Sequence, residues 1–469
     1  MKPPILIFTL LSSTLGFSAL PILSSAQEVT AAASQPPAST VPSSQNSQNS
    51  QDSQNSQDSQ DSQETTSSIS QTPNNQASSA PKIAKPKLIP KKVIVPLPAS
   101  STPDLSVPVF AAKSYVLYDF SSQQTLLGNN ANERIEPAAL TKLMTAYVSF
   151  SALRSNKITL KQNVQPTAET LRGENSGPNT SAGRMFLSQN KAVTVEELLH
   201  GLIVLSADDA ARILAATIAG SETQFAALMN LEAQRLNMQN THFANATGVN
   251  ATGQALTQQY STAADLTVLA AALVRDFPDM IAMYSLREYQ HNGIKQANRN
   301  RLLWMDPFVD GLEIGNVGNT AFNIVASAKR AQRRLIAVII NAPSNNQRHT
   351  ETQKMLNYGF QNFETLRLYQ KDQAVSRIRI WKGTESNINV GFREDFFITI
   401  PNGQFSKLKA TMETVQPLFA PISSSQKIST LRLTLDDKPF GEYPLVALER
   451  VPVANVLSRG WDNIQLFFQ

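Results

Sequence analysis

A short segment, Pro137 to Lys142 (Pro-Ala-Ala-Leu-Thr-Lys), carries the spacing of a catalytic motif but lacks one essential atom. In a Ser-x-x-Lys sequence at a helix start, a hydroxyl and an amine three residues apart lie on the same helical face. The lysine takes up or relays the hydroxyl proton while the serine attacks an acyl carbon. Here the serine position is Ala139, and a methyl group is no nucleophile. The segment therefore predicts an acyl-transfer site that has lost its nucleophile and kept Lys142.

The elements around this segment predict the domain that holds it. Alternating residues indicate strands at 114–119 and 125–127, and apolar residues at core spacing indicate a helix over 137–153. Further helices are predicted over 195–205, 209–219, 222–236 and 262–275, followed by paired strands at 324–328 and 334–340 and a closing helix at 350–363. Strands that enclose a helical middle predict an α/β (α+β) domain over residues 107–368, with one central antiparallel sheet and a helical subdomain.

After residue 368 the sequence changes character. Short alternating runs at 378–381, 388–390, 396–400, 408–412 and 431–435 are separated by turn sequences, which predicts a small antiparallel β domain over residues 369–450. The tail, residues 451–469, places Leu457, Trp461, Ile464 and Phe468 on one helical stripe. This stripe predicts a short amphipathic helix over 456–469 that lies peripherally on the inner membrane, or packs on its own domain as the alternative.

The N-terminal quarter predicts export. Lys2, an apolar run over 5–23 and the small residues 24–26 are typical of a secretory signal peptide over residues 1–26, with an uncleaved anchor as the alternative. Residues 27–106 are rich first in Ser, Gln and Asn and then in Lys and Pro, which predicts a disordered linker. Its lysines favour a solvated spacer over a contact with anionic polymer or lipid. We expect a periplasmic protein, with a peripheral position on the outer face of the inner membrane as a further expectation.

Composition excludes several kinds of site. The chain has no cysteine, which removes disulfides, thiolate metal sites and cysteine nucleophiles. Its four histidines are scattered without metal-ligand spacing, so we expect no metal and no cofactor. A net charge of +5 is modest for 469 residues, and no nucleic-acid motif is present, so we expect no nucleic-acid partner.

From about Ala112 onwards the chain resembles the low-molecular-mass penicillin-binding proteins that act as serine D-alanyl-D-alanine carboxypeptidases. The resemblance extends beyond the motif at 137–142 to 183–186, 240–243, 259–262, 298–304, 309–311 and, in the second domain, 416–418 and 443–448. It implies the fold shared with serine β-lactamases, and peptidoglycan stem peptides as the ligand. The family carries three motifs, namely Ser-x-x-Lys, Ser-x-Asn and Lys-Thr-Gly.

All three motifs depart from the family pattern. Ser206 matches the second motif, but Asp208 stands where the family has asparagine. The third motif reads Glu313-Ile314-Gly315, so that only the glycine is kept and a glutamate replaces the lysine. Arg348 matches the arginine that the family places ahead of its closing helix to hold the substrate carboxylate. The alternative for Arg348 is a surface helix-cap residue.

These departures change the expected electrostatics. Lys142, Asp208 and Glu313 sum to a formal charge of −1, against about +2 for two lysines and a neutral asparagine. We expect Lys142 to form an ion pair with Asp208 or Glu313; otherwise it points into a wet cleft. Such a reversal opposes an anionic ligand, and loss of a nucleophile costs on the order of 10⁶ in turnover.

Three functions follow from the sequence. The first is an exported, non-catalytic family member that binds peptidoglycan or another cell-wall enzyme and regulates wall remodelling. The alternative is a D-alanyl-D-alanine carboxypeptidase with residual or altered activity. A decaying gene product is the third, and the intact core and turn patterns argue against it.

Overall fold

The structure, a computed structural model, describes residues 106–172, 183–249 and 259–456 of the 469. The predicted signal peptide, the linker up to residue 105 and the tail from residue 457 lie outside these described residues. Within the described ranges, no helix combines the length and the apolar character needed to cross a membrane.

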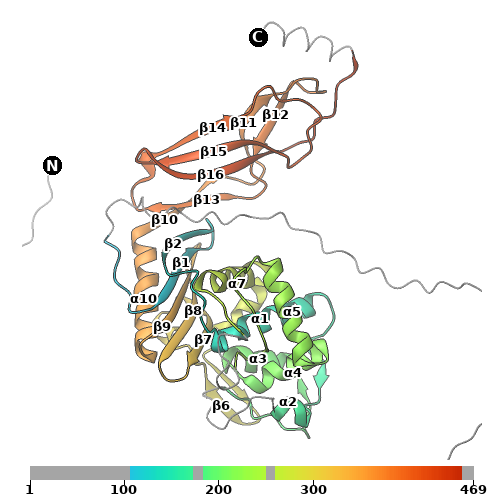
Figure 1. Cartoon of the computed structure of the whole chain (residues 1–469), viewed down its shortest axis with the longest axis vertical. Helices are drawn as coiled ribbons and strands as arrows, with labels where there is room; N and C mark the ends of the chain where they lie inside the picture. The colour runs from blue at the N-terminus through green and yellow to red at the C-terminus, as the bar shows by residue number, and fades with distance from the viewer. Residues whose placement is uncertain (1–105, 173–182, 250–258, 457–469) are drawn as a thin grey trace, which may run out of the picture. The chain divides into compact units, whose positions relative to one another are not determined.

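The first domain is built on a five-stranded antiparallel sheet in the order β2-β1-β9-β8-β7 (Figure 1). Its strands are β1 (Ser114–Asp119), β2 (Gln124–Asn129), β7 (Val309–Val317), β8 (Ala321–Arg330) and β9 (Arg333–Ala342). The sheet thus joins the beginning and the end of the domain, and the helical middle of the chain lies between them in sequence. The predicted α/β class with a central antiparallel sheet is confirmed.

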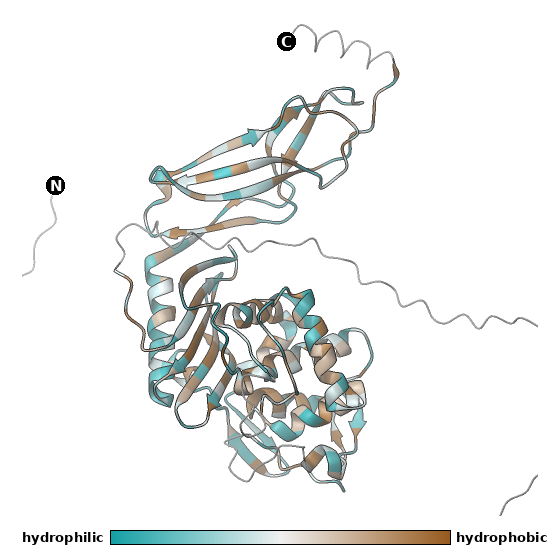
Figure 2. Ribbon diagram, viewed as in Figure 1, coloured by the Kyte–Doolittle hydropathy of each residue, from teal (hydrophilic) through white to brown (hydrophobic). Residues whose placement is uncertain are grey.

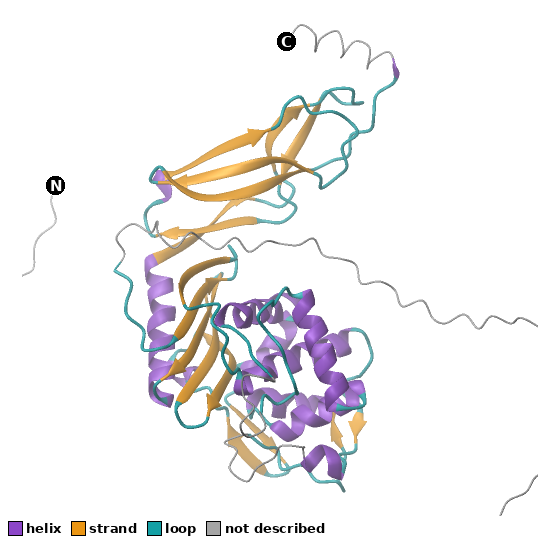
Figure 3. Cartoon of the chain, viewed as in Figure 1, coloured by secondary structure: helices purple, strands orange, loops and turns teal. Residues whose placement is uncertain are grey.

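Helices cover both faces of this sheet, because its buried strands are apolar on both sides (Figures 2 and 3). On β9, Ile336 and Val338 pack into the helical subdomain, whereas Ala337 and Ile339 pack with α10. The helical elements are η1 (Ala138–Thr141), α1 (Lys142–Arg154), α2 (Ala168–Arg172), α3 (Val195–Val204), α4 (Asp208–Ala219), α5 (Glu222–Arg235), α7 (Ala263–Asp276), η2 (Pro278–Met280), α8 (Ile281–Tyr284), α9 (Leu302–Met305) and α10 (Asn345–Asn362).

Side-chain caps set the starts of several helices. Thr194 forms a capping box with Glu197 at the start of α3, and Thr262 accepts a hydrogen bond from the third residue of α7. At α10 the cap is Ser344, so this helix begins five residues earlier than predicted. Its first turn is polar and gives no apolar periodicity, which explains the late predicted start.

The first domain also contains two short two-stranded sheets, which the sequence prediction did not include. One pairs β3 (Asn163–Val164) with β4 (Val193–Thr194), and the other pairs β5 (Glu288–His291) with β6 (Ile294–Ala297). Both are only two to four residues long, too short for a period-two pattern to stand out.

The second domain is an antiparallel β structure, as predicted. β10 (Phe363–Tyr369) pairs with β13 (Phe396–Pro401), and a five-stranded sheet has the order β11-β12-β16-β15-β14. These strands are β11 (Ala374–Arg379), β12 (Asn387–Gly391), β14 (Leu408–Thr414), β15 (Lys427–Leu435) and β16 (Lys438–Ala447), with η3 (Phe405–Lys407) before β14. The prediction missed β16 because Pro439 and Pro444 weaken its strand signal. β10 crosses the boundary predicted after residue 368.

Candidate active site

The three motif positions, far apart in sequence, meet at one place in the first domain. Ala139 lies in η1, Ser206 and Asp208 lie at the start of α4, and Gly315 lies on β7. A Cβ atom on Gly315 would lie 3.1 Å from the carbonyl oxygen of Pro137 and 3.3 Å from the backbone nitrogen of Ala139. A residue without a side chain therefore allows β7 to lie directly against the start of the first motif.

The hydroxyl nearest in sequence to the missing nucleophile does not replace it. Ala139 is partly exposed, whereas Thr141 is fully buried. A Cβ atom on Gly248 would lie 2.9 Å from Thr141 Oγ1, so the hydroxyl faces that loop. Thr141 is therefore not placed to act as a substitute nucleophile.

Lys142 forms a buried ion pair with Asp208. Its side chain is only 2% exposed, and its Nζ lies 2.7 Å from Asp208 Oδ1 and donates a hydrogen bond to the carbonyl oxygen of Thr247 at 3.1 Å. The predicted pairing is confirmed for Asp208, and the wet-cleft alternative is wrong. No ion pair within 4.0 Å joins Lys142 to Glu313 among the residues described. The amine is thus held between α1, α4 and a loop by an ion pair and a hydrogen bond.

Glu313 lies buried at the base of the site, beside Ser206. Burial raises the pKa of Glu313 to about 7, against the opposing effects of Lys142, the Ile314 backbone N–H, the Ser206 hydroxyl and Arg299. The Ile314 N–H donates to Glu313 Oε1 at 3.0 Å. Ser206 Oγ influences this pKa but, within the described residues, has no partner in good hydrogen-bond geometry. Glu313 is therefore partly protonated near neutral pH.

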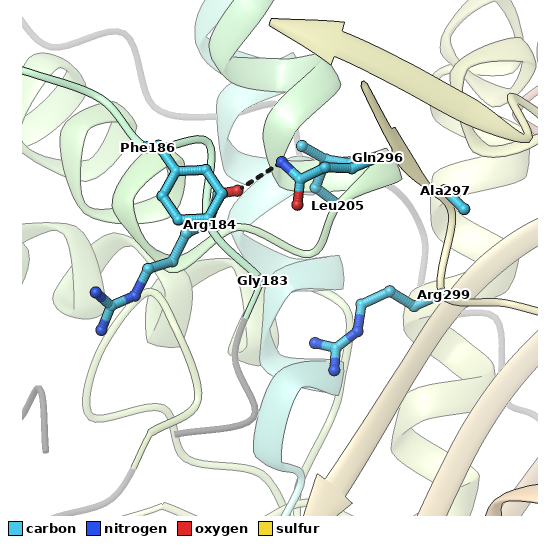
Figure 4. A pocket seen from close by; sticks show the side chains of 7 residues that line it. All are labelled: Gly183, Arg184, Phe186, Leu205, Gln296, Ala297 and Arg299. Carbon is cyan, nitrogen blue, oxygen red and sulfur yellow. Dashed lines mark hydrogen bonds between the residues drawn. The ribbon is translucent and has the colours of Figure 1, made fainter. Parts of the chain in front are cut away.

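A pocket of about 490 Å³ adjoins this site (Figure 4). It is lined by Gly183, Arg184, Phe186, Leu205, Gln296, Ala297 and Arg299. The loop on one side is anchored to α4, because Asp208 N donates to the Gly183 carbonyl at 3.0 Å and Met185 N donates to Asp209 Oδ1 at 3.0 Å. Gln296 Nε2 donates to the Arg184 carbonyl at 2.9 Å and joins the loop to β6.

The two arginines of the pocket change the charge predicted for the cleft. Arg184 and Arg299 both lie on its wall, and within the described residues neither has a carboxylate within 4.0 Å. The predicted formal charge of −1 counted the motif positions alone; with these two cations the sum is −1 + 2 = +1. The predicted opposition to an anionic ligand therefore applies to the motif positions and not to the wall of the adjoining pocket, which carries two cations. Sequence reasoning missed the pair because 114 intervening residues separate the two arginines.

Arg348 supports the strand that carries the third motif. It lies in the first turn of α10, not ahead of it, and is 1% exposed, so the surface helix-cap alternative is wrong. Its Nη1 donates to the carbonyl oxygens of Gly315 and Asn323, both at 3.1 Å, and to Asn316 Oδ1 at 2.7 Å. Burial and Arg299 lower the pKa of Arg348 to about 10. Arg348 thus fixes β7 against β8 behind the site.

The described side chains show no arrangement of ligands for a metal ion. Among the residues described, no group of three or more His, Asp or Glu side chains is arranged to hold one.

The buried ion pair gives a first prediction. Replacing Lys142 by Met, or Asp208 by Leu, leaves one uncompensated buried charge and should lower the free energy of unfolding by about 3–5 kcal/mol in urea titrations. The double variant should cost less than either single variant, because no charge is then stranded. Removing the exposed Lys295–Glu288 pair, as a control, should cost under about 1 kcal/mol. Equal losses for both pairs would contradict the assignment.

The raised pKa of Glu313 gives a second prediction. Between its ordinary value of 4.5 and about 7 the folded state binds more protons than the unfolded state, so ionisation lowers stability as pH rises. Glu313→Gln removes this dependence. The unfolding free energy of the variant relative to wild type should therefore rise by about 3 kcal/mol between pH 5 and pH 8.

The matched control for this second prediction is Glu288→Gln, at an exposed glutamate. Its effect on the unfolding free energy should not change across the same pH range. A difference between Glu313→Gln and wild type that stays constant from pH 5 to pH 8 would show that the Glu313 carboxyl titrates normally.

Comparison with known sequences agrees with this geometry. The family described as D-alanyl-D-alanine carboxypeptidase matches residues 101–344, and the one described as the C-terminal domain of penicillin-binding protein 5 matches residues 363–453. The D-alanyl-D-alanine carboxypeptidase DacC of Escherichia coli is 36% identical over 366 residues, which cover 78% of this chain and 90% of DacC. DacF of Bacillus subtilis is 31% identical over 352 residues, covering 74% of this chain and 87% of DacF.

Solved structures show the same fold. Penicillin-binding protein 5 of Haemophilus influenzae aligns with a TM-score of 0.70 at 34% identity, covering 74% of this chain and 99% of that one. Penicillin-binding protein 6B of Escherichia coli aligns with a TM-score of 0.61 at 34% identity, covering 74% and 98%. The expected β-lactamase/DD-peptidase-like domain followed by a β domain is confirmed. The chain belongs to the low-molecular-mass penicillin-binding proteins of the serine D-alanyl-D-alanine carboxypeptidase family.

Proposed function

We propose that this protein binds peptidoglycan stem peptides without cleaving them, and that it thereby scaffolds or regulates wall remodelling, alone or with another cell-wall enzyme. The observation that carries the proposal is the partly exposed methyl group of Ala139, placed against Gly315 where a nucleophilic hydroxyl would have to stand. Without that oxygen, no acyl-enzyme forms at position 139.

The rest of the site favours binding over turnover. Lys142 is engaged by Asp208 and the Thr247 carbonyl, so it is poorly placed to accept a proton from position 139. The adjoining pocket is open and carries two arginines, which attract an anionic peptide. The close packing of Gly315 and the support from Arg348 keep the strand beside the site in place. A site that has lost its chemistry therefore keeps the means to hold a ligand.

We infer that this binding takes place in the periplasm. The support is the signal-like sequence at residues 1–26 and the membership of a family whose members are named for action on D-alanyl-D-alanine. The amphipathic pattern at 456–469 supports a peripheral contact with the outer face of the inner membrane.

A second candidate is a carboxypeptidase with altered chemistry. Ser206 carries a buried hydroxyl with no hydrogen-bond partner in the described residues, and Glu313, whose pKa is about 7, lies beside it. A serine next to a carboxylate that titrates near neutrality is a nucleophile with a general base. Ser206 is only 2% exposed, however, so a substrate carbonyl has little access to it.

Labelling with a fluorescent penicillin, read after denaturation, separates the two candidates. Wild type should give no covalent adduct, while penicillin-binding protein 5 of Haemophilus influenzae serves as the positive control. Ala139→Ser alone should label at no more than a trace, because Lys142 stays paired with Asp208. Adding Asp208→Asn, Glu313→Lys and Ile314→Thr to it should raise labelling well above the single variant.

Two results would contradict the non-catalytic proposal. Labelling of wild type that disappears in Ser206→Ala would establish the altered enzyme. Rapid labelling of Ala139→Ser would show that the ion pair does not restrain Lys142. Release of D-alanine from stem pentapeptides by wild type would have the same meaning as the first result.

A further inference from the structure

We propose that strand β14 is a docking edge for a second copy of this chain, and that two β14 strands pair antiparallel about a twofold axis at Thr411. The second-domain sheet of one copy then continues into that of the other. This pairing lies in the second domain and is independent of ligand binding at the candidate active site.

The outer edge of β14 is open. In the order β11-β12-β16-β15-β14 this strand comes last, at the margin of the sheet (Figure 1). In the described part of the chain, no other segment forms a backbone ladder with its outer side. Five consecutive residues, 409–413, are exposed, so both faces of the strand are accessible as well as its edge. The unpaired N–H and C=O groups of such an edge can form a ladder with an added strand.

Strand β14 lacks the features by which proteins usually block a sheet edge. It pairs with β15 in continuous register from Leu408 to Thr414, without a bulge, and it contains no proline. The opposite edge strand, β11, is different. Its register with β12 is irregular after Ala374, and Arg377 and Arg379 place like charges on one face. Pairing of two β11 strands would bring arginines together, so that edge is protected and β14 is not.

The sequence of β14 is self-complementary in one register. With Thr411 opposite Thr411 of the second copy, Lys409 lies opposite Glu413 of that copy. Ala410 then lies opposite Met412. The twofold axis repeats each contact, so two ion pairs flank the threonine pair on one face, and two Met–Ala contacts lie on the other. An in-register parallel pair would instead place lysine against lysine and glutamate against glutamate.

The internal partners of these charges do not prevent the pairing. Lys409 forms an ion pair with Asp437. Glu413 forms one with Arg432, which also pairs with Glu442. All these side chains are exposed, so each internal pair is weak in water and each charge can accept a second partner. The charged face of β14 is thus part of a network of alternating charges, which a second copy extends.

The test uses single cysteines, because the chain has none of its own. Pairing through one strand buries little surface, and a disulfide traps even a weak dimer. Residues directly opposite in an antiparallel pair lie within disulfide reach, whereas diagonal neighbours are too far apart. In the purified full-length chain, Thr411→Cys should form a covalent dimer on mild oxidation. Ala410→Cys and Met412→Cys should each dimerise poorly alone and should cross-link to each other when mixed. Arg377→Cys, at an exposed position of the opposite edge, is the matched control and should stay monomeric.

Charge reversal tests the register. In the Thr411→Cys background, Lys409→Glu places glutamates opposite each other, and Glu413→Lys does the same with lysines. Each variant should slow the formation of covalent dimer about tenfold, because two attractive pairs become repulsive. An equimolar mixture of the two variants should recover the original rate, since each reversed charge then faces an unlike one. Glu385→Lys, an exposed substitution with the same charge change, should have no effect. Recovery on mixing does not depend on how well either variant folds, because a misfolded variant would not recover.

Four results would overturn the proposal. The first is an equal cross-linking rate for Thr411→Cys and Arg377→Cys, which would indicate random collision. The second is a mixture of charge variants that cross-links no faster than either variant alone. The third is a Thr411→Cys thiol that neither cross-links nor reacts with a small maleimide, which would show that another part of this chain covers the edge. The fourth is a thiol that reacts with the maleimide and still does not cross-link, which would leave the edge to a strand of a different protein.

Discussion

The buried ion pair between Lys142 and Asp208 is the interaction on which the site depends most. It joins the first residue of α1 to the first residue of α4, and the Thr247 carbonyl adds a third segment. Two charges removed from water remain stable only when each satisfies the other, so the two helix starts are constrained to one relative position. This position also fixes the pocket, because Asp208 N holds the Gly183 carbonyl at the pocket wall.

The same ion pair helps to explain how this protein keeps the fold of a serine acyl-transfer site without its reaction. In a serine acyl-transfer site the lysine must exchange protons with a neighbouring hydroxyl; here there is no hydroxyl at Ala139, and the amine has a permanent partner. Glu313, in place of a lysine, is a buried carboxylate that no cation in the described part of the chain approaches within 4.0 Å. The fold around the site has meanwhile kept its tight contacts, such as Gly315 against the backbone of Ala139. The protein can therefore lack the nucleophile for acyl transfer and still keep the packing of the site.

Much of the fold followed from local patterns. Apolar spacing located the helices from 137 to 275 within a few residues, since an amphipathic helix needs only short-range periodicity. The pattern failed where a helix cap or strand pairing determines the bounds of an element. Helix α10 starts at its Ser344 cap. Strand β16 forms despite Pro439 and Pro444 because β15 and β12 lie on either side of it. Those features depend on contacts with residues far away in the sequence. The local pattern of apolar and polar residues carries no information about such contacts.

For the site, the sequence alone determined which atoms are present. Ala139 carries no nucleophile, and Asp208 and Glu313 are carboxylates wherever the chain folds. Only the tertiary structure decided which charges meet: Lys142 pairs with Asp208 and not with Glu313, Arg348 is buried behind β7, and Arg184 and Arg299 reach one pocket. The physical reason is that electrostatic energy depends on distance and burial, and neither quantity is a property of residue order. The missing nucleophile was thus readable from the sequence, whereas the cationic character of the cleft was not.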